Sequence, residues 1–391
     1  MFIFDASNII LKKDFSLFVE SKKNALESKK RKLFEQYKIL SKKSWDKNIT
    51  LFEQFRDEYN GVVHGVLLDV IAYYRKFLPE KCLIVEFGSF VKRTERLFSD
   101  FDFTICYDTA KTEQYEVTEQ LINYSLASIF GYSIDQVHGK FQHYPDMPEV
   151  YIYTEKDNHY RLSFQDGVID YKCGPETLNE NLMNIKNVRD YKSMIDGYEE
   201  KYTQKCNIDC LYSIRIIENT TDHDFIGDLE LLEQKYDICD GYPFDLVPYE
   251  LSNKFQVSEI KKILKSKGIV EFYIFISMLR KRINFCSTYS MAISELWSNP
   301  IMLSFFGQDY ITQLREVFSE FIFYFNRIEL SLKQRGIALS TRCYIDFTAQ
   351  SMNNLLSEDW GETTSIEQII DARNQLAIVI QKGLFLLEER G

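Results

Sequence analysis

The chain is poor in residues that end helices or build compact metal sites: its 391 residues include 7 Pro, 16 Gly and 5 His. The histidines are scattered, and Cys206 and Cys210 lack a second close cysteine pair that would complete a zinc site. The longest apolar run, 269–279, contains Glu271 and is too short to cross a membrane. The sequence therefore predicts no structural zinc and no membrane partner.

The first residues do not have the pattern of a secretory signal peptide. The apolar opening Met1–Phe4 is interrupted by Asp5 and soon followed by Lys12 and Lys13, so it lacks an apolar core and a cleavage site. Eight cysteines without a disulfide-type framework fit a reducing compartment. We therefore expect a cytoplasmic protein.

Composition favours a folded protein with a large core. Hydrophobic residues make up 45% of the chain and aromatic residues 15%, which excludes general disorder, and the length suffices for two or three domains. The net charge of −11 argues against a general nucleic-acid-binding surface. The charge is uneven, however: residues 12–47 carry twelve Lys or Arg against five acids, whereas residues 222–240 carry seven acids and one Lys.

The most informative pattern is a glycine-serine turn followed by a pair of aspartates. Gly88 and Ser89 follow the apolar run 82–87, and after ten residues Asp100 and Asp102 alternate with phenylalanines. Successive strand residues point to opposite faces, so the two carboxylates share one face, about 6.5 to 7 Å apart. Glycine lets a backbone approach a polyphosphate closely. Together these residues suit metal-assisted phosphoryl chemistry.

In these residues the chain resembles the nucleotidyltransferase superfamily of the DNA polymerase β type. The signature of that family is a hydrophobic residue, Gly-Ser or Gly-Gly, nine to thirteen residues, and Asp-x-Asp between hydrophobic residues, and 87–103 matches it. The resemblance covers about residues 82–175. The fragment is similar to bacterial cyclic-oligonucleotide synthases, protein uridylyltransferases and aminoglycoside nucleotidyltransferases alike, so it does not select a branch.

The resemblance implies a third carboxylate on a later strand. Residues 158–164 and 168–172 alternate in polarity around the turn Gln165-Asp166-Gly167, which predicts a hairpin. Asp170, in the second strand, is the favoured third acid. Asp166 is the rival, but an Asp before Gly is explained by turn chemistry alone. The expected metal ligands and catalytic residues are thus Asp100, Asp102 and Asp170, with Mg2+ or Mn2+ as cofactor.

The loop between the glycine-serine turn and the aspartates carries three cations. Lys92, Arg93 and Arg96 each have two interpretations, contact with phosphate or a solvated loop. Gly88, Ser89, Lys92 and Arg93 are the expected contacts of a nucleoside triphosphate such as ATP. Lys172 and the run 280–282 are further candidates that one sequence cannot rank.

The basic segment 12–47 is predicted to be an amphipathic helix. Its apolar positions recur at helical spacing: Phe15, Phe18, Leu26, Leu33, Tyr37 and Leu40. The lysines then form the opposite face of the helix. Exposure to solvent is the default explanation of this face, and binding of RNA is the more specific hypothesis. RNA is therefore a candidate partner.

The order of elements predicts an α+β fold with a small mixed sheet. We expect N-terminal helices in 1–78, including one at 57–77 that packs on the sheet, a nucleotidyltransferase core in 79–178, and an all-helical domain in 179–391. Helices are expected in the last part at 208–218, 226–238, 257–266, 270–285, 310–334 and 366–389. The final helix is preceded by Thr364 and Ser365, each three residues before Glu367 or Gln368, as in a capping box.

The function implied by the resemblance is transfer of a nucleoside monophosphate to a hydroxyl with release of pyrophosphate. Three hypotheses remain open from the sequence. The acceptor is a small molecule, protein or nucleotide; or it is RNA, as for a toxin acting on tRNA ends; or the chain is a catalytically silent nucleotide-binding scaffold.

Overall fold

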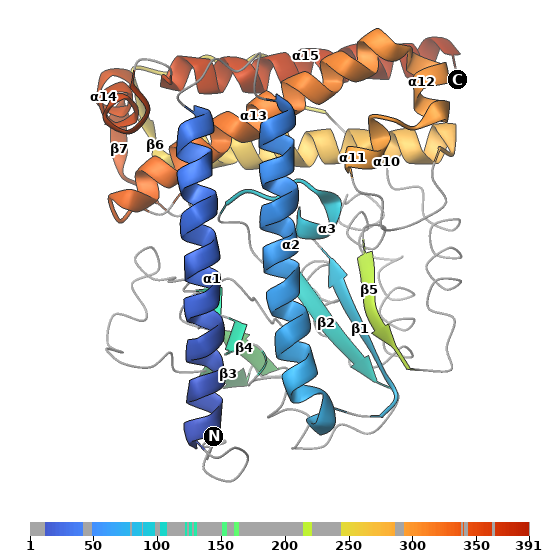
Figure 1. Ribbon diagram of the computed structural model, residues 1–391. Coiled ribbons are helices and arrows are strands. Elements are labelled where there is room, and N and C mark those ends of the chain that lie inside the picture. Colours follow the sequence, from blue (N-terminus) through green and yellow to red (C-terminus); the bar gives the residue numbers. More distant parts are fainter. Residues whose placement is uncertain are drawn as a thin grey trace. The chain divides into compact units, whose positions relative to one another are not determined.

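The computed structural model describes much of the chain (Figure 1). The described residues are 12–41, 49–78, 80–87, 89–97, 102–107, 122, 125–126, 129–130, 151–154, 160–163, 214–220, 244–285, 293–337, 339, 343–361 and 364–390. They fall into two compact units, each assembled from three segments of the chain. The sheet unit spans Met1–Leu33, Glu58–Val91 and Ser99–Ile238, and the helical unit spans Phe34–Asp57, Lys92–Phe98 and Cys239–Gly391. Helices together with antiparallel strands make this an α+β protein, as predicted.

Two long helices lie at the start of the described chain. α1 spans Lys12–Ser41 and α2 spans Ile49–Tyr74, followed by the 3-10 turn η3, Arg75–Phe77. The predicted apolar stripe of α1 is confirmed where it is described, because Leu26, Tyr37 and Leu40 are buried and Phe18 stacks on Tyr73 with ring centroids 3.9 Å apart. The side chains at 15 and 33, and residues 42–47, lie outside the described part.

The sheet unit contains a three-stranded antiparallel sheet in the order β2-β1-β5 (Figure 1). β1 spans Cys82–Phe87, as predicted, β2 spans Asp102–Tyr107 and β5 spans Ile214–Asn219. The prediction of a helix over 208–218 is wrong from 214 onward. β-branched Ile at 214, 216 and 217 favours a strand, and pairing with β1 satisfies its backbone groups.

One face of this sheet is covered by α2. Cys82, Ile84 and Glu86 alternate along β1 and are all buried. His64 of α2 lies 2.8 Å from Glu86, measured from Nδ1 to Oε2, which confirms the prediction that this helix packs on the sheet. α2 is also fixed to the chain after β1, since Asn60 Nδ2 donates to the Phe90 carbonyl at 2.7 Å.

Two further strand pairs are present. β3, Tyr151–Thr154, pairs with β4, Tyr160–Ser163, close to the strands predicted at 149–154 and 158–164. The predicted strand 168–172 lies outside the described residues. β6, Lys254–Gln256, pairs with β7, Asp346–Thr348. Together with β5, this pair corrects the prediction that the chain beyond 178 is all-helical.

Helices dominate the helical unit. They are α9 Val257–Lys261, the π-helix η5 Lys262–Val270, α10 Glu271–Ile283, α11 Ile293–Leu296, α12 Pro300–Phe306, α13 Gln308–Gln334, α14 Ala349–Trp360 and α15 Ile366–Arg390. The predicted cap of α15 is confirmed, because the Ser365 N–H donates to Gln368 Oε1 at 2.8 Å and the Gln368 N–H donates to Ser365 Oγ at 3.3 Å. Its predicted core stripe is buried as well: Ile366, Ile369, Ile370, Leu376, Val379, Ile380 and Leu387.

The N-terminal helices contribute to the core of the helical unit. Tyr37 is fully buried, and its hydroxyl donates to the Phe323 carbonyl at 2.7 Å. Its ring packs edge-on against Phe323 and Trp360, with centroids 5.6 and 5.9 Å away, and lies near Phe52 of α2. Aromatic pairs of this kind add to the stability that burial alone supplies.

Gly383 of α15 packs so closely that no side chain fits there. A Cβ at this position would overlap the Tyr310 hydroxyl and the Phe275 ring. We expect Gly383→Ala to lower the free energy of unfolding by about 1–3 kcal/mol. Gly61 of α2 is the matched control, because a Cβ there meets nothing, and Gly61→Ala should stabilise the chain by up to about 1 kcal/mol. Urea titration of both variants compares them; equal effects would contradict the close packing.

A buried arginine anchors the extended chain that precedes β6. Arg373 is 0% exposed and donates to the carbonyls of Val247, Asp245 and Lys267, each at 2.8 Å. Glu271 lies beside it, with Oε2 3.6 Å from Arg373 Nη2, and its Oε1 accepts from the Asp245 N–H at 2.8 Å. The side chains of Arg373 and Glu271 are thus both removed from water.

Stability should fall with rising pH because of Glu271. Burial raises its pKa from the ordinary 4.5 to about 7, against the opposing effects of the Asp245 N–H and Arg373. The folded state therefore binds a proton more tightly than the unfolded state, and this contribution, present below pH 4.5, is lost as the pH rises through 7. Glu271→Gln, which mimics the protonated acid, should be more stable than the wild type at pH 8 by up to about 3 kcal/mol. Urea titrations at pH 5 and 8 measure this; an equal difference at both pH values would contradict it.

Candidate functional site

The structure describes only part of the site expected from the glycine-serine and aspartate pattern. Gly88, Asp100 and Asp170 lie outside the described residues, and Lys92 and Asp102 are described by their backbone alone. Ser89 and Arg93 are described in full, the first in the sheet unit and the second in the helical unit.

Strand register brings the two halves of the expected motif together. Asp102 is the first residue of β2 and pairs with Phe87, the last residue of β1. Ser89 then begins the short helix α3, Ser89–Lys92, two residues beyond the end of β1. Asp102 therefore lies at the end of the paired strands where β1 leads on to Ser89.

Glu86 is a buried acid on the face of this sheet that α2 covers. Glu86 Oε2 accepts from Arg215 Nη1 of β5 at 3.1 Å, besides its contact with His64. Phe87 and Asp102 are paired across the two strands, so their side chains share one face of the sheet. Glu86 precedes Phe87 and therefore points to the opposite face. Glu86 thus joins β1 to β5 and α2 and is not part of the expected metal site.

Arg96 has neither of the roles predicted for it. It is 4% exposed, forms an ion pair with Glu329 of α13, and stacks over the Phe325 ring with Cζ 4.6 Å from the centroid. The next residue is held as well, because the Leu97 N–H donates to Asn326 Oδ1 at 3.0 Å. Arg96 is neither solvated nor in reach of a phosphate; it fixes the loop to α13.

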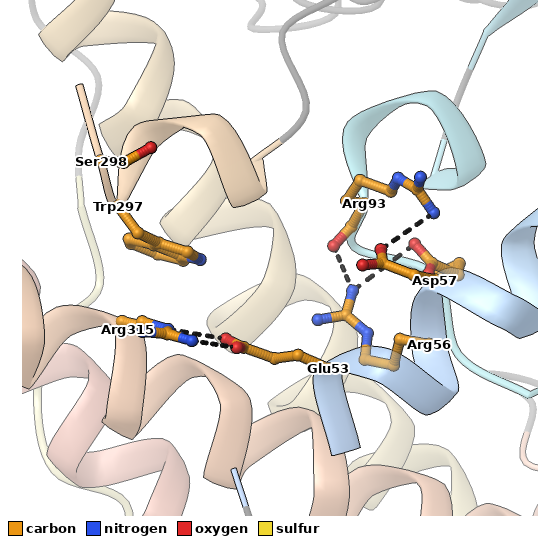
Figure 2. Close-up of a pocket in the computed structure, with 8 residues that line it drawn as sticks. Glu53, Arg56, Asp57, Arg93, Trp297, Ser298 and Arg315 are labelled. Atoms are coloured by element: carbon orange, nitrogen blue, oxygen red, sulfur yellow. Dashed lines mark hydrogen bonds and ion pairs between the residues drawn. The ribbon is translucent and has the colours of Figure 1, made fainter. Parts of the chain in front are cut away.

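The helical unit contains a cavity of about 290 Å³ (Figure 2). Figure 2 shows Trp297 and Arg315 on one side of it, and Arg56, Asp57 and Arg93 on the other. Its charged wall is formed by α2, by α13 and by the loop that follows α3. The charged residues are Glu53, Arg56, Asp57, Arg93, Glu95 and Arg315. Trp297 and Ser298 complete the lining. Arg93, expected to contact phosphate, lies here.

Cations and acids on the cavity wall are paired one to one. Arg315 Nε donates to Glu53 Oε1 at 3.0 Å, and its Nη2 donates to Oε2, which makes a bidentate pair. Arg93 Nη1 lies 3.4 Å from Asp57 Oδ1, and Arg56 Nη2 lies 3.5 Å from Glu95 Oε2. The wall therefore carries no excess of positive charge.

Several buried polar atoms of this wall make no hydrogen bond to any described residue. They are Arg56 Nε, Arg93 Nε and Nη1, and Glu95 Oε1. The Glu95 side chain is 1% exposed, and burial raises its pKa although Arg56 and Arg93 lower it. These atoms have almost no accessible surface, so leaving them unpaired lowers the stability of the folded chain.

Backbone strain accompanies this arrangement. Arg93 has a φ of 60°, in the left-handed region that glycine occupies without cost and other residues at about 1–2 kcal/mol. Its carbonyl accepts from Arg56 Nη2. The side chain that glycine would lack at this position is the one that pairs with Asp57.

Comparisons with protein-family models, with curated proteins and with solved structures find no match for this chain. Among the described residues, no group of three or more His, Cys, Asp or Glu is placed to hold a metal ion. No helix in those same segments is long and apolar enough to cross a membrane.

Sequence reasoning missed the cavity, apart from Arg93. Its residues come from around 53–57, 93–95, 297–298 and 315, and no local pattern connects them. The available signal was weak: the acids and cations of α2 at 53, 56 and 57 lie on a helix otherwise rich in apolar residues.

Proposed function

We propose that the chain is a metal-dependent nucleotidyltransferase that moves a nucleoside monophosphate from a nucleoside triphosphate to a hydroxyl acceptor. The observation that carries the proposal is the pairing of Asp102 with Phe87, which sets the acidic strand beside the strand that ends at the glycine-serine turn. Ser89 supports it further, because it follows β1 closely and its hydroxyl and backbone N–H can donate to phosphate oxygens.

The acids of the motif suit the implied metal. Asp100, Asp102 and Asp170 offer only carboxylate oxygens, the ligands that Mg2+ and Mn2+ prefer. When bound, the metal supplies positive charge that stabilises the attacking and leaving oxygens.

The residues have distinct parts in the proposed reaction. Gly88, Ser89 and Lys92 would hold the β and γ phosphates, and Asp100, Asp102 and Asp170 would hold the metal. The acceptor hydroxyl oxygen bonds to the α phosphorus as the bond to the bridging oxygen breaks, and pyrophosphate leaves with that electron pair. The hydroxyl proton passes to Asp170 or to water. Since Arg93 is engaged with Asp57 in the helical unit, the phosphate role is assigned to the other three residues.

Direct assay tests the proposal. The purified chain is incubated with each α-labelled nucleoside triphosphate and Mg2+ or Mn2+, and the products and pyrophosphate are analysed. Pyrophosphate release dependent on metal and on one preferred triphosphate is expected. Binding of a triphosphate without any turnover, across metals and cell extracts that supply acceptors, would favour the silent scaffold instead.

Transfer to RNA is the second candidate, favoured by exposed cations on α1. Lys29, Arg31 and Lys32 are exposed, whereas Lys22 pairs with Asp69 and Lys38 with Glu35. The same assay with cell RNA added tests it. If RNA is the acceptor, labelling should weaken with salt and in the triple variant Lys29→Gln, Arg31→Gln, Lys32→Gln.

A further inference from the structure

We propose that Glu271, Arg373 and Asn374 form a clasp for an extended, acidic segment of another protein, and that residues 244–253 of the chain itself occupy this clasp as a detachable strap. Clasp and strap both belong to the helical unit, within Cys239–Gly391. Binding of such a segment is independent of the proposed transfer reaction, and it is measurable without turnover.

The clasp holds the strap by its main chain. Glu271 Oε1 accepts from the Asp245 N–H at 2.8 Å. Arg373 donates to the carbonyls of Asp245 and Val247, both at 2.8 Å. An extended chain repeats every two residues, so the main-chain groups of 245 and 247 lie along one edge of it. The clasp therefore recognises an extended conformation at these positions and not a particular side chain.

Asn374 continues the same pattern two residues further on. Its Oδ1 accepts from the Tyr249 N–H at 2.9 Å, and its Nδ2 donates to the Tyr249 carbonyl at 3.0 Å. Pro248 is compatible with the clasp because none of these bonds uses a main-chain N–H at 248. Proline also fixes its own φ and favours an extended residue before it, which reduces the entropy lost when the segment is held. The contacts thus resemble recognition of an added strand, in which main-chain hydrogen bonds supply the affinity.

The side chains of the strap contribute no core. None of residues 244–253 is buried, and Val247 is 70% exposed. Beyond the strap, Phe255 of β6 is buried and fixes the chain again. A segment with few buried apolar contacts opens at a lower free energy than the core does. The strap is therefore expected to leave the clasp as a unit, with β6 as its attachment and without unfolding of the helices.

The charge around the strap indicates the chemistry of the partner. Arg373 and Glu271 are 0% and 2% exposed with the strap in place, so both need new hydrogen bonds when it leaves, and another extended chain supplies them. Lys267 Nζ donates to Asp245 Oδ2. This bond lowers the pKa of the Asp245 carboxyl, and the charges of Arg373 and Lys262 act in the same direction. The partner segment is therefore expected to carry an acid at this position.

The test uses the full chain and a fluorescent peptide with the sequence of residues 244–253. The wild type should bind the peptide weakly, because the strap competes for the clasp. Tyr249→Pro in the chain removes one hydrogen bond of the strap, the one to Asn374 Oδ1, and should bind the peptide about three- to tenfold more tightly than the wild type. Tyr249→Ala keeps that N–H and should bind like the wild type. No binding by Tyr249→Pro, or equal binding by the two variants, would overturn the proposal.

Variants of the clasp are compared in the chain whose strap is already weakened. Adding Asn374→Ala to Tyr249→Pro removes two bonds to the peptide but only one to the strap, so peptide binding should weaken about three- to tenfold. Gln375→Ala, at the next and exposed position of α15, is the matched control and should leave binding unchanged. A peptide with Pro in place of its Tyr should bind more weakly than one with Ala there. Equal affinity with and without the Asn374 side chain would contradict the assignment of the clasp.

Hydrogen exchange measures whether the peptide replaces the strap. Adding the peptide to the wild type should speed exchange at the N–H groups of Asp245 and Tyr249 and leave that of α13 unchanged. Exchange of these two groups only together with the helices would rule out a detachable strap. A wild-type dimer that the peptide dissociates would make a second copy of the chain the occupant, and would overturn the assignment to another protein.

Discussion

Asp102→Asn should reduce nucleotide transfer by at least about a thousandfold. Asparagine keeps the size of the side chain but removes the charge that a metal ion requires, so the loss is one of chemistry and not of shape. Asp102 begins β2 at the edge of its pairing with β1, and its backbone hydrogen bonds do not depend on the side chain. The free energy of unfolding should therefore change little. Asp100→Asn should behave in the same way.

The control for these variants is Asp69→Asn on α2. Asp69 is an exposed aspartate whose partner is Lys22, at 2.7 Å, and exposed pairs of this kind contribute at most about 1 kcal/mol. This variant should transfer nucleotide at the rate of the wild type. Pyrophosphate release measured under identical metal concentrations compares the three proteins. Full activity in either motif variant would remove the basis of the proposed function.

Glu329→Ala should lower the free energy of unfolding by about 3–5 kcal/mol, because it leaves the Arg96 guanidinium charged and buried. Both side chains of this pair are less than a tenth exposed, so water cannot replace the lost carboxylate. The loss should be accompanied by greater proteolytic sensitivity of the loop that Arg96 fixes to α13. Urea titration measures the first effect, and limited trypsin digestion the second.

The double variant Arg96→Met, Glu329→Leu separates the charge from the packing. If desolvation of an unpaired charge causes the loss, replacing both residues with apolar ones of similar size should restore most of the stability. Arg96→Met alone should resemble Glu329→Ala, since it leaves a buried carboxylate. A loss below about 1 kcal/mol in either single variant would show that the pair is not buried in solution.

Sequence patterns predicted those helices and strands that are determined by residues close together in the chain. β1 has the expected bounds, and α13 and α15 begin and end within two residues of their predicted limits, because apolar periodicity and a capping box are local signals. β5 escaped prediction because its partner strand lies about 130 residues earlier: Arg215 pairs with Glu86. A short isoleucine-rich run does not by itself distinguish a strand from a helix.

The contacts of Arg96 and the lining of the cavity could not be predicted either, because they also depend on residues far apart in the sequence. A loop containing Lys92, Arg93 and Arg96 has the composition of a solvated surface, and only α13, more than 200 residues later, provides the Glu329 that buries one of these cations. The motif residues themselves could be proposed from spacing, since Asp102 begins a strand that pairs with β1 and Ser89 follows β1 closely in the sequence. Residues that come together only through tertiary packing have no characteristic spacing in the sequence.

The burial of Tyr37 against Phe323 has a consequence for how this protein could evolve. The helical unit consists of Phe34–Asp57 and Lys92–Phe98 as well as Cys239–Gly391, so no single crossover in the gene separates the two units intact. A recombinant that inherits only the residues after 238 would expose Phe323 and Trp360, which Tyr37 covers. The two units are therefore expected to pass together from one lineage to another, and to diversify by substitution and not by exchange of modules.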